Sequence, residues 1–263
     1  MKAVLFDLDN TLIDFMRMKK ISCEGKIVQG ITKYFEKEGQ SKAVVGLSGG
    51  IDSAVVLRLL CKALGSANVT ALIMPNTGIT KKTNVYDAED LAKQLKVKYY
   101  IIPIDELYHS FSRFPWRQSE IAKGNLNARI RAIILYNFAN SNGALVAGTG
   151  NKSEFWMGYF TKYGDAAADF FPIANLLKKQ VRALGIYLKL PEQFLLKAPS
   201  AELWANQEDE KEMGVTYDDL DELLPLILKN KKTPESKAHI VKKIKKQIRA
   251  TEHKRKAAQI MKV

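Results

Sequence analysis

Apolar residues are distributed along this chain in two alternating patterns. Continuous apolar runs lie at 43–47, 69–74, 98–103 and 144–147. Between these runs, apolar residues recur every three or four positions at 22–38, 54–60, 85–95 and 123–138. The short runs predict buried strands and the periodic segments predict helices, whereas 105–120 carries little signal of either kind.

This alternation of strands and helices indicates an α/β fold. Strands separated by helices pair in parallel, so we expect a Rossmann-like, doubly wound parallel sheet flanked by helices. Ligands of such sheets bind at the carboxyl ends of the strands. Ser48 and Pro75 both follow a predicted strand, which places them at that edge.

The segment 46–53, with the sequence GLSGGIDS, joins the first predicted strand to the next helix. Its glycines allow backbone N–H groups to approach an anion closely, and the first helical turn directs further N–H groups at it. Ser48 and Ser53 can donate hydrogen bonds, and Asp52 supplies a carboxylate for a phosphate-bound Mg²⁺. No Gly-Lys-Ser/Thr follows and three spaced glycines are lacking, which excludes the two commonest nucleotide loops.

Composition limits the class of protein. The chain has 263 residues, 46% of them hydrophobic, enough for one substantial core with a helical appendage. It lacks an apolar run of about 18 residues, and acidic residues interrupt its apolar N-terminus, so we expect neither a membrane span nor a secretory signal. Cys23 and Cys61 are predicted to be free thiols in a reducing cytosol. The net charge of +13 favours polyanionic partners, either nucleic acid or a substrate with several phosphates.

The first residues carry a separate signal. Residues 1–15 form an apolar segment ending in Asp7-Leu8-Asp9-Asn10-Thr11, which resembles the first motif of haloacid-dehalogenase-type phosphatases. Two carboxylates in that pattern could hold Mg²⁺ and attack a phosphoryl group. The loop at Ser48 follows too soon to leave room for the rest of that fold. Residues 1–20 are therefore predicted to be an N-terminal extension with an extra strand, and 21–263 the main domain.

A second strand end repeats the chemistry of the first. The segment 148–154, GTGNKSE, follows the fourth predicted strand, and its Thr149 and Glu154 could bind a nucleotide and Mg²⁺ respectively. Arg129 and Arg131 lie two positions apart on the preceding predicted helix and must face different directions. One is expected to reach the ligand while the other braces the fold, or both are surface charge.

Seven further motifs occur in order along the chain: GLSGGxDS, GNLxARxR, GTGNKSE, GYFTKYGD, LxKxQVR around Lys178, PSAxLW at 199–204 and DExxxGVTY at 209–217. Together they resemble the ammonia-dependent NAD⁺ synthetases, which belong to the pyrophosphate-loop ATP pyrophosphatases of the adenine-nucleotide α-hydrolase type. The similarity covers about residues 22–256.

The resemblance implies a ligase reaction of NAD biosynthesis. Mg-ATP adenylates the nicotinate carboxylate of deamido-NAD⁺ (nicotinic acid adenine dinucleotide) and releases pyrophosphate, and ammonia then displaces AMP to give NAD⁺. Cationic side chains and Mg²⁺ stabilise the charge on the leaving pyrophosphate. The resemblance also implies a cytoplasmic homodimer with Mg²⁺ as cofactor, with the dinucleotide bound near the interface. We expect neither a membrane nor a nucleic acid as partner.

The resemblance assigns roles to matching positions. Asp52, Lys162 and Lys178 are the implied catalytic residues, and Asp52 and Glu154 the implied Mg²⁺ ligands. Implied deamido-NAD⁺ contacts are Arg129, Lys162, Asp169, His253 and Lys254. Implied ATP contacts are Gly46, Leu47, Ser48, Gly49, Gly50, Ile51, Asp52, Ser53, Thr149, Lys178 and Ser200.

Several positions depart from the pattern or leave alternatives open. Ala166 and Ala167 replace usual glycines, which would strain the loop if those sites need positive φ, and Glu202 replaces a small residue. Alternative functions are an ATP pyrophosphatase acting on another acceptor such as tRNA, which the basic segment 229–262 would suit, or a non-catalytic nucleotide-binding protein. No glutamine-hydrolysing domain is recognisable, so free ammonia, or ammonia from a separate partner, is the expected nitrogen source.

Overall fold

A computed structural model describes residues 23–200, 202–204 and 207–261 of the chain. The extra strand predicted within residues 1–20 lies outside the described residues.

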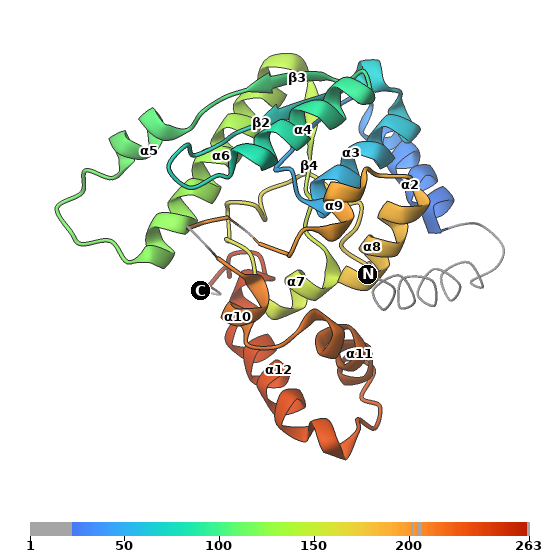
Figure 1. Cartoon of the computed structure of the whole chain (residues 1–263), viewed down its shortest axis with the longest axis vertical. Coiled ribbons are helices and arrows are strands. Elements are labelled where there is room, and N and C mark those ends of the chain that lie inside the picture. Colours follow the sequence, from blue (N-terminus) through green and yellow to red (C-terminus); the bar gives the residue numbers. More distant parts are fainter. Residues whose placement is uncertain (1–22, 201, 205–206, 262–263) are drawn as a thin grey trace.

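The four predicted strands form one parallel sheet (Figure 1). Their order is β3-β2-β1-β4, and Val45 of β1 pairs with Ala71 of β2 on one side and Ala147 of β4 on the other. The α/β fold with a parallel sheet is therefore confirmed. The strands are β1 (Lys42–Gly46), β2 (Val69–Ile73), β3 (Lys98–Ile101) and β4 (Ala144–Ala147).

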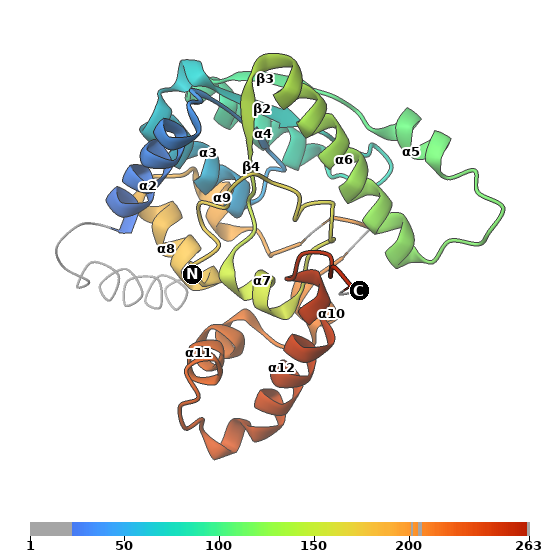
Figure 2. The same ribbon diagram turned by 180° about the vertical axis from the view of Figure 1, so that it is seen from behind.

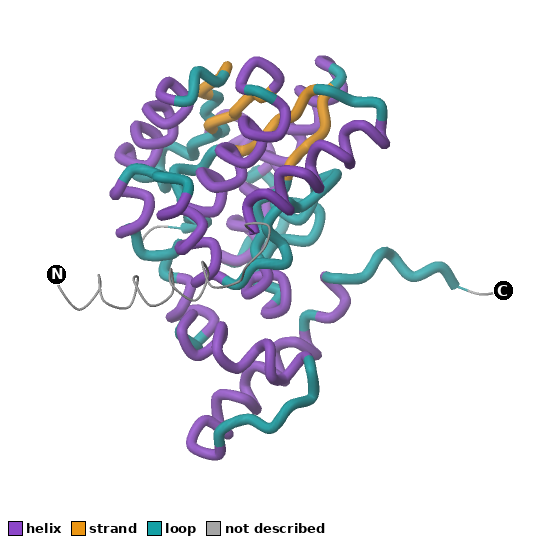
Figure 3. The backbone as a smooth tube through the Cα atoms, turned by 90° about the vertical axis from the view of Figure 1, so that its right-hand side faces the viewer, coloured by secondary structure: helices purple, strands orange, loops and turns teal. Residues whose placement is uncertain are grey.

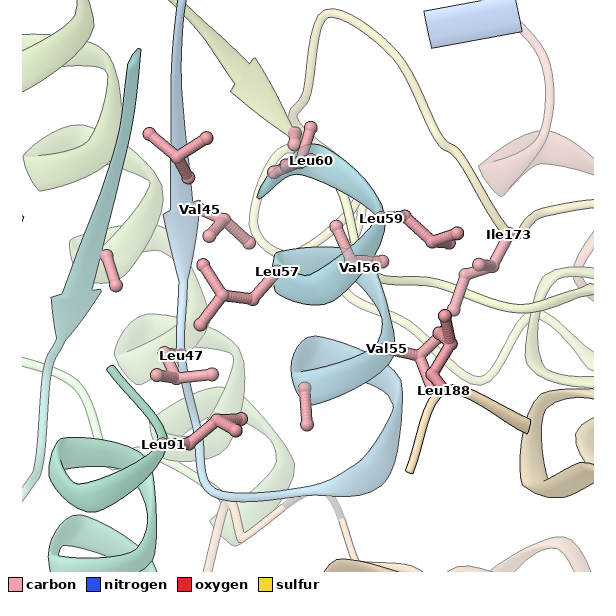
Figure 4. Packing of buried hydrophobic residues seen from close by; sticks show 14 of the residues in the cluster. Val45, Leu47, Val55, Val56, Leu57, Leu59, Leu60, Leu91, Ile173 and Leu188 are labelled. Carbon is pink, nitrogen blue, oxygen red and sulfur yellow. The ribbon is translucent and has the colours of Figure 1, made fainter. Parts of the chain in front are cut away.

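Helices cover both faces of this sheet because its strands are apolar on both sides. Val45, Ala71 and other alternate residues face the helices α2 (Cys23–Glu38), α3 (Ile51–Leu64), α4 (Lys82–Gln94) and α8 (Lys178–Tyr187). Figure 4 shows Val45 of the central strand β1, and Leu47 just after it, against Leu57 of α3. On the opposite face, Val44, Leu72 and Val146 pack against α6 (Glu120–Asn142).

The order of the strands fixes the position of a crevice. The chain runs outward from β1 through β2 to β3, and α6 then returns it to β4 on the other side of β1. The direction in which successive strands are added to the sheet therefore reverses between β1 and β4. Such a reversal opens a ligand-binding crevice at the carboxyl ends of these two strands.

The remaining elements are short. Figure 2 shows α5 and the stretch after it extending away from the sheet before α6 begins. The helix α5 was not expected, because its segment lacks a helical apolar period. These elements are η1 (Ser66–Asn68), α5 (Asp105–Phe111), α7 (Lys152–Met157), α9 (Glu192–Leu196), α10 (Asp209–Met213), α11 (Tyr217–Leu228), η2 (Glu235–Lys237), α12 (Ala238–Ala250) and η3 (Glu252–Lys254).

The C-terminal helices α11 and α12 form a hairpin beside the sheet domain (Figure 3). They share a second apolar cluster that includes Leu220, Leu224, Val241 and Ile244, together with Met157 of α7. Val241 and Ile244 of α12 are buried in this cluster, while the lysines of α12 face outward.

Two compositional predictions can be compared with the structure. Cys23 and Cys61 are both free, and partial burial raises the pKa of each thiol. Among the helices of the described residues, none is long and apolar enough to cross a membrane.

Candidate functional site

The loop between β1 and α3 is bonded to itself through two serines. Ser53 Oγ accepts a hydrogen bond from the Ser48 N–H at 3.2 Å and donates one to the Gly50 carbonyl at 3.0 Å. Ser48 Oγ lies 3.1 Å from Ser53 Oγ and accepts from the Gly50 N–H at 3.2 Å. The N-cap residue of α3 is Gly50, which has no side chain to cap the helix. The first N–H groups of α3 can therefore bind an anion.

Gly49 is the residue at which this loop turns. Its φ is +83°, and a Cβ there would lie 2.3 Å from the carbonyl oxygen of Asn84. Lys197 Nζ donates to the Gly49 carbonyl at 3.0 Å and pairs with Asp87 at 2.5 Å. Both the backbone conformation and the space at this position therefore require glycine.

Lys178 is the buried cation of the site. It is 2% exposed, and its Nζ lies 2.5 Å from Asp52 Oδ2 and 3.1 Å from Glu154 Oε1. Asp52 comes from the first turn of α3, Glu154 from α7, and Lys178 is the first residue of α8. The structure thus brings together both predicted metal ligands and a predicted catalytic lysine.

Burial and neighbouring charges alter the pKa values of Glu154 and Lys178. The pKa of Glu154 is raised to about 7, mainly by burial. The charge of Lys178 lowers this pKa, whereas the charges of Asp52 and Asp209 raise it. Burial alone would lower the pKa of Lys178, but the two neighbouring carboxylates outweigh that effect and raise it. Lys178 is therefore a permanent cation at neutral pH.

Asp52 and Glu154 fit a Mg²⁺ ion that is held jointly with phosphates. Both carboxylates reach the same Lys178 Nζ beside the loop between β1 and α3. Within the described part of the chain, no group of three or more His, Cys, Asp or Glu side chains could hold a metal alone. Mg²⁺ is commonly bound by one or two carboxylates, substrate phosphates and water, which this pair can satisfy.

Asn151 holds the two carboxylates in place. Its Nδ2 donates to Asp52 Oδ1 at 2.9 Å, and its Oδ1 accepts from the Glu154 N–H at 3.0 Å. The Glu154 carboxylate accepts the Asn151 N–H in return, which completes a capping box at the start of α7. The Asn-x-x-Glu spacing is compatible with such a box, but sequence reasoning missed Asn151 as a site residue.

A cavity of about 560 Å³ opens beside these residues. The carboxyl ends of β1, β2 and β4, the start of α3 and the segment after α9 surround it, as the strand order predicts. The predicted site residues that line it are Gly46, Leu47, Ser48, Gly49, Gly50, Ile51, Asp52, Ser53, Thr149, Glu154, Lys178, Ser200 and Lys254.

Arg131 is a cavity residue whose direction the sequence does not determine. Arg131 is half-buried, and desolvation lowers the pKa of its guanidinium, whose Nε donates to the Met74 carbonyl at 2.9 Å. Arg129 instead is exposed and donates to the Lys162 carbonyl at 3.3 Å. Of the two arginines, Arg131 therefore faces the cavity.

Four predicted deamido-NAD⁺ contacts lie outside the cavity lining: Arg129, Lys162, Asp169 and His253. Three of them are neighbours, because Arg129 contacts the Lys162 carbonyl and Lys162 Nζ donates to the His253 carbonyl at 2.9 Å. Lys254 joins this group to the cavity. Its Nζ donates to the carbonyls of Gly158 and Phe160, each at 2.8 Å.

Asp169 is held separately, next to β4. Its carboxylate accepts the Val146 N–H at 2.7 Å and the Tyr136 hydroxyl at 3.1 Å, and its carbonyl accepts the Tyr34 hydroxyl at 3.1 Å. Burial and the Asp169 charge raise the pKa of Tyr136 to about 12. Asp169 therefore stands among aromatic hydroxyl groups rather than among the phosphate-binding groups.

The backbone is not strained at Ala166 and Ala167, the two positions where alanine replaces a usual glycine. Among the described residues, those other than glycine with positive φ include Tyr163 and Glu202 but neither Ala166 nor Ala167. The two alanines are therefore compatible with this loop. Glu202, at φ +47°, lines the cavity and accepts a hydrogen bond from Asn84 Nδ2 at 2.5 Å.

Comparisons with known proteins agree with this geometry. The family model described as NAD synthase matches residues 24–258. The NH(3)-dependent NAD(+) synthetase of Archaeoglobus fulgidus is 43% identical over 242 residues, which cover 90% of this chain and 97% of that protein.

The chain belongs to the NAD synthase family. Two solved structures resemble this family member along nearly its whole length. The NMN synthetase of Francisella tularensis has a TM-score of 0.84 at 39% identity and covers 92% of this chain and 98% of its own. The NH3-dependent NAD synthetase of Campylobacter jejuni has a TM-score of 0.77 at 32% identity, with 91% and 98% covered. The NAD synthase match spans every predicted site residue, from Gly46 to Lys254, and confirms the resemblance seen in the sequence.

Proposed function

We propose that this chain makes NAD⁺ from deamido-NAD⁺, ATP and ammonia through an acyl-adenylate. The observation that carries the proposal is the placement of Lys178 between Asp52 and Glu154, directly beside a loop built to bind phosphates. The named relatives from Archaeoglobus fulgidus and Campylobacter jejuni support the same reaction.

In the first step, a carboxylate oxygen of the nicotinate attacks the α-phosphorus of ATP and pyrophosphate leaves. The loop N–H groups and Ser48 would bind the phosphates, and Lys178 would offset the charge that builds on the leaving pyrophosphate. Mg²⁺ held by Asp52 and Glu154 would supply a Lewis acid to the phosphate oxygens.

In the second step, ammonia attacks the acyl carbon, loses a proton, and AMP leaves with the former carboxylate oxygen. A carboxylate cannot itself lose an oxide, so adenylation supplies the leaving group. The cavity walls, including Arg131 and Lys254, would hold the adenylate while ammonia enters.

The decisive experiment follows the nicotinate carboxylate oxygen that leaves with AMP. Deamido-NAD⁺ labelled with ¹⁸O in its nicotinate carboxylate is incubated with Mg-ATP and ammonium, and NAD⁺, AMP and pyrophosphate are quantified. We expect equal amounts of all three products, with ¹⁸O in the AMP phosphate and no product when glutamine replaces ammonium. Unlabelled AMP would contradict the adenylate, and pyrophosphate release that requires tRNA instead of deamido-NAD⁺ would favour the other acceptor class.

A mononucleotide substrate is the second candidate, because the Francisella tularensis relative is named an NMN synthetase. The same assay decides between them through the ratio of kcat/KM for deamido-NAD⁺ to kcat/KM for nicotinic acid mononucleotide. A ratio above one supports the dinucleotide and a ratio below one the mononucleotide.

The size of the cavity bears on where the second substrate binds. A volume of about 560 Å³ lies within the usual range for a single drug-sized ligand. ATP and a dinucleotide together need more space. We infer that deamido-NAD⁺ extends over Lys254 onto the neighbouring group of Arg129, Lys162 and His253, outside the cavity.

We further infer that the chain forms a homodimer through the projecting segment of α5, the following loop and the start of α6. Large apolar side chains are exposed along this segment, and Phe114 stacks on Trp116 with ring centroids 4.5 Å apart. A contiguous exposed apolar surface is typical of an interface. Its exposed members are Leu107, Phe111, Phe114, Trp116 and Ile121.

Replacing both Phe114 and Trp116 with serine is expected to convert the dimer to monomers in sedimentation velocity. The matched control is Tyr86→Ser on α4, where a 69% exposed tyrosine lies outside the proposed interface and dimers should persist. A double variant that sediments like the wild type would contradict this interface.

A further inference from the structure

One face of α11 carries two buried polar residues next to the Asp52, Glu154 and Lys178 group. Tyr217 and Asp221 are each 2% exposed and lie four positions apart, so they point to the same side of the helix. Neither lines the cavity. Any effect of these two residues on a ligand must therefore act through their neighbours.

Tyr217 contacts both a predicted metal ligand and the buried lysine. Its hydroxyl lies 3.3 Å from Glu154 Oε1 and 3.1 Å from Asp209 Oδ2, and it can donate to either carboxylate. Lys178 Nζ stands over the Tyr217 ring, 5.2 Å from its centroid. This distance is within the range of a cation–π interaction. One side chain thus limits the positions of Glu154 and Lys178 together.

Asp221 fixes the start of the helix that carries Lys178. Its Oδ2 accepts the Lys179 N–H at 2.7 Å and its Oδ1 accepts the Ser153 hydroxyl at 2.5 Å. Ser153 Oγ in turn accepts the Lys178 N–H at 3.1 Å. The first N–H groups of α8 have no partner within their own helix, so α11 and α7 supply the partners instead.

We propose that Tyr217 and Asp221 are positioning residues that hold Glu154 and Lys178 in the geometry needed for adenylation. This inference rests on the proposed function, because it assigns the two residues a role only through that reaction. The Asp221 contact through Ser153 also reaches the residue next to Glu154, so α11 restrains both sides of the charged group.

Packing alone does not require these residue types. The other buried positions of α11 are Leu220, Leu223 and Leu224, and they already join this helix to α12 through the second apolar cluster. A buried carboxylate and a buried phenol are costly unless they are hydrogen-bonded. The hydrogen bonds of the two side chains run to Glu154, to Asp209 and to the elements that carry Glu154 and Lys178.

The test compares Tyr217→Phe and Asp221→Asn with Leu224→Ala, a control on the same helix whose side chain packs in the second apolar cluster. Tyr217→Phe keeps the ring and removes only the hydroxyl. We expect each of the first two variants to lower kcat for pyrophosphate release by about 10–100-fold, the usual effect of losing a supporting partner of a metal site. KM for deamido-NAD⁺ should stay unchanged. Leu224→Ala should lower the unfolding midpoint but keep wild-type kcat below that temperature.

Equilibrium binding supplies a readout that is independent of turnover. By calorimetry, Tyr217→Phe should weaken binding of Mg-ATP but leave binding of ATP in EDTA unchanged, because Glu154 is the affected group. Wild-type kcat in both variants, or an equal loss in Leu224→Ala, would overturn the inference. If the wild type itself released no pyrophosphate from ATP and deamido-NAD⁺, the proposed function would fail instead.

Discussion

Replacing Lys178 with methionine is expected to lower kcat for NAD⁺ formation by about 10²–10³-fold, the usual cost of removing one charge-stabilising group at a reacting centre. Methionine keeps much of the volume and removes the charge that lies between Asp52 and Glu154. The free energy of unfolding should also fall by about 3 kcal/mol, because two carboxylates remain without their buried partner. Steady-state kinetics and chemical denaturation measure the two effects.

The loss of stability in Lys178→Met should depend on pH. Without the lysine charge, the pKa of Glu154 rises above its value of about 7 in the wild type. A carboxyl whose pKa is higher in the folded state stabilises the fold at low pH and loses this contribution as pH rises through the folded pKa. In EDTA, the variant should therefore be closer to wild-type stability at pH 6 than at pH 8.

The adjacent Lys179→Met provides the control, because the Lys179 side chain is exposed and its backbone N–H makes the contact with Asp221. It should keep wild-type kcat and stability. Equal losses in the two variants would show that general positive charge, rather than the Lys178 contact, is responsible.

Replacing Gly49 with alanine is expected to abolish ATP binding at millimolar concentration and to destabilise the fold by more than about 3 kcal/mol. An alanine at φ +83° is strained by about 1–3 kcal/mol, and its Cβ would also meet the Asn84 carbonyl at 2.3 Å. The loop must move away from α4 to relieve this contact. Calorimetric titration with ATP and thermal unfolding measure the result.

Gly65→Ala separates the two causes. Gly65, at the end of α3, has a similar φ of +80°, but apart from its two chain neighbours no described residue has an atom within 4 Å of the place that a Cβ would take. It should lose only the strain energy and bind ATP normally. If Gly49→Ala is no more damaging than Gly65→Ala, the close approach to Asn84 has no consequence for the site.

The strands and the Gly-rich loop between β1 and α3 could be predicted because local sequence determines them. The apolar runs ending at Leu47 and Ala147 mark strands that are followed directly by polar and glycine-rich segments. Because the two strands are parallel neighbours, these segments lie at the same edge of the sheet. The residues that contact these site side chains come from distant parts of the sequence. Tyr217 meets Glu154 across 63 positions of sequence, and no periodicity in α11 distinguishes a tyrosine that packs from one that supports a site.

The direction in which a side chain points is a second feature that the sequence does not determine. The spacing of Arg129 and Arg131 requires different directions, but only the packing of α6 against Met74 shows that Arg131 enters the cavity. Likewise, glycine-to-alanine departures at Ala166 and Ala167 suggest strain that the backbone does not contain. The apolar surface on α5 and the following loop has no strand or helix pattern, because its aromatic residues are exposed rather than aligned on a buried face.

The contacts of Lys254 have a consequence for biosynthesis. Lys254 follows every other cavity residue in the sequence, yet its Nζ donates hydrogen bonds to the carbonyls of Gly158 and Phe160. Arg255 donates one to the carbonyl of Trp156. A ribosome must therefore synthesise the chain as far as Arg255 before these contacts near Gly158 can form. A chain that ends before Lys254 would carry the loop at 46–53 without the contacts that hold Gly158 and Phe160.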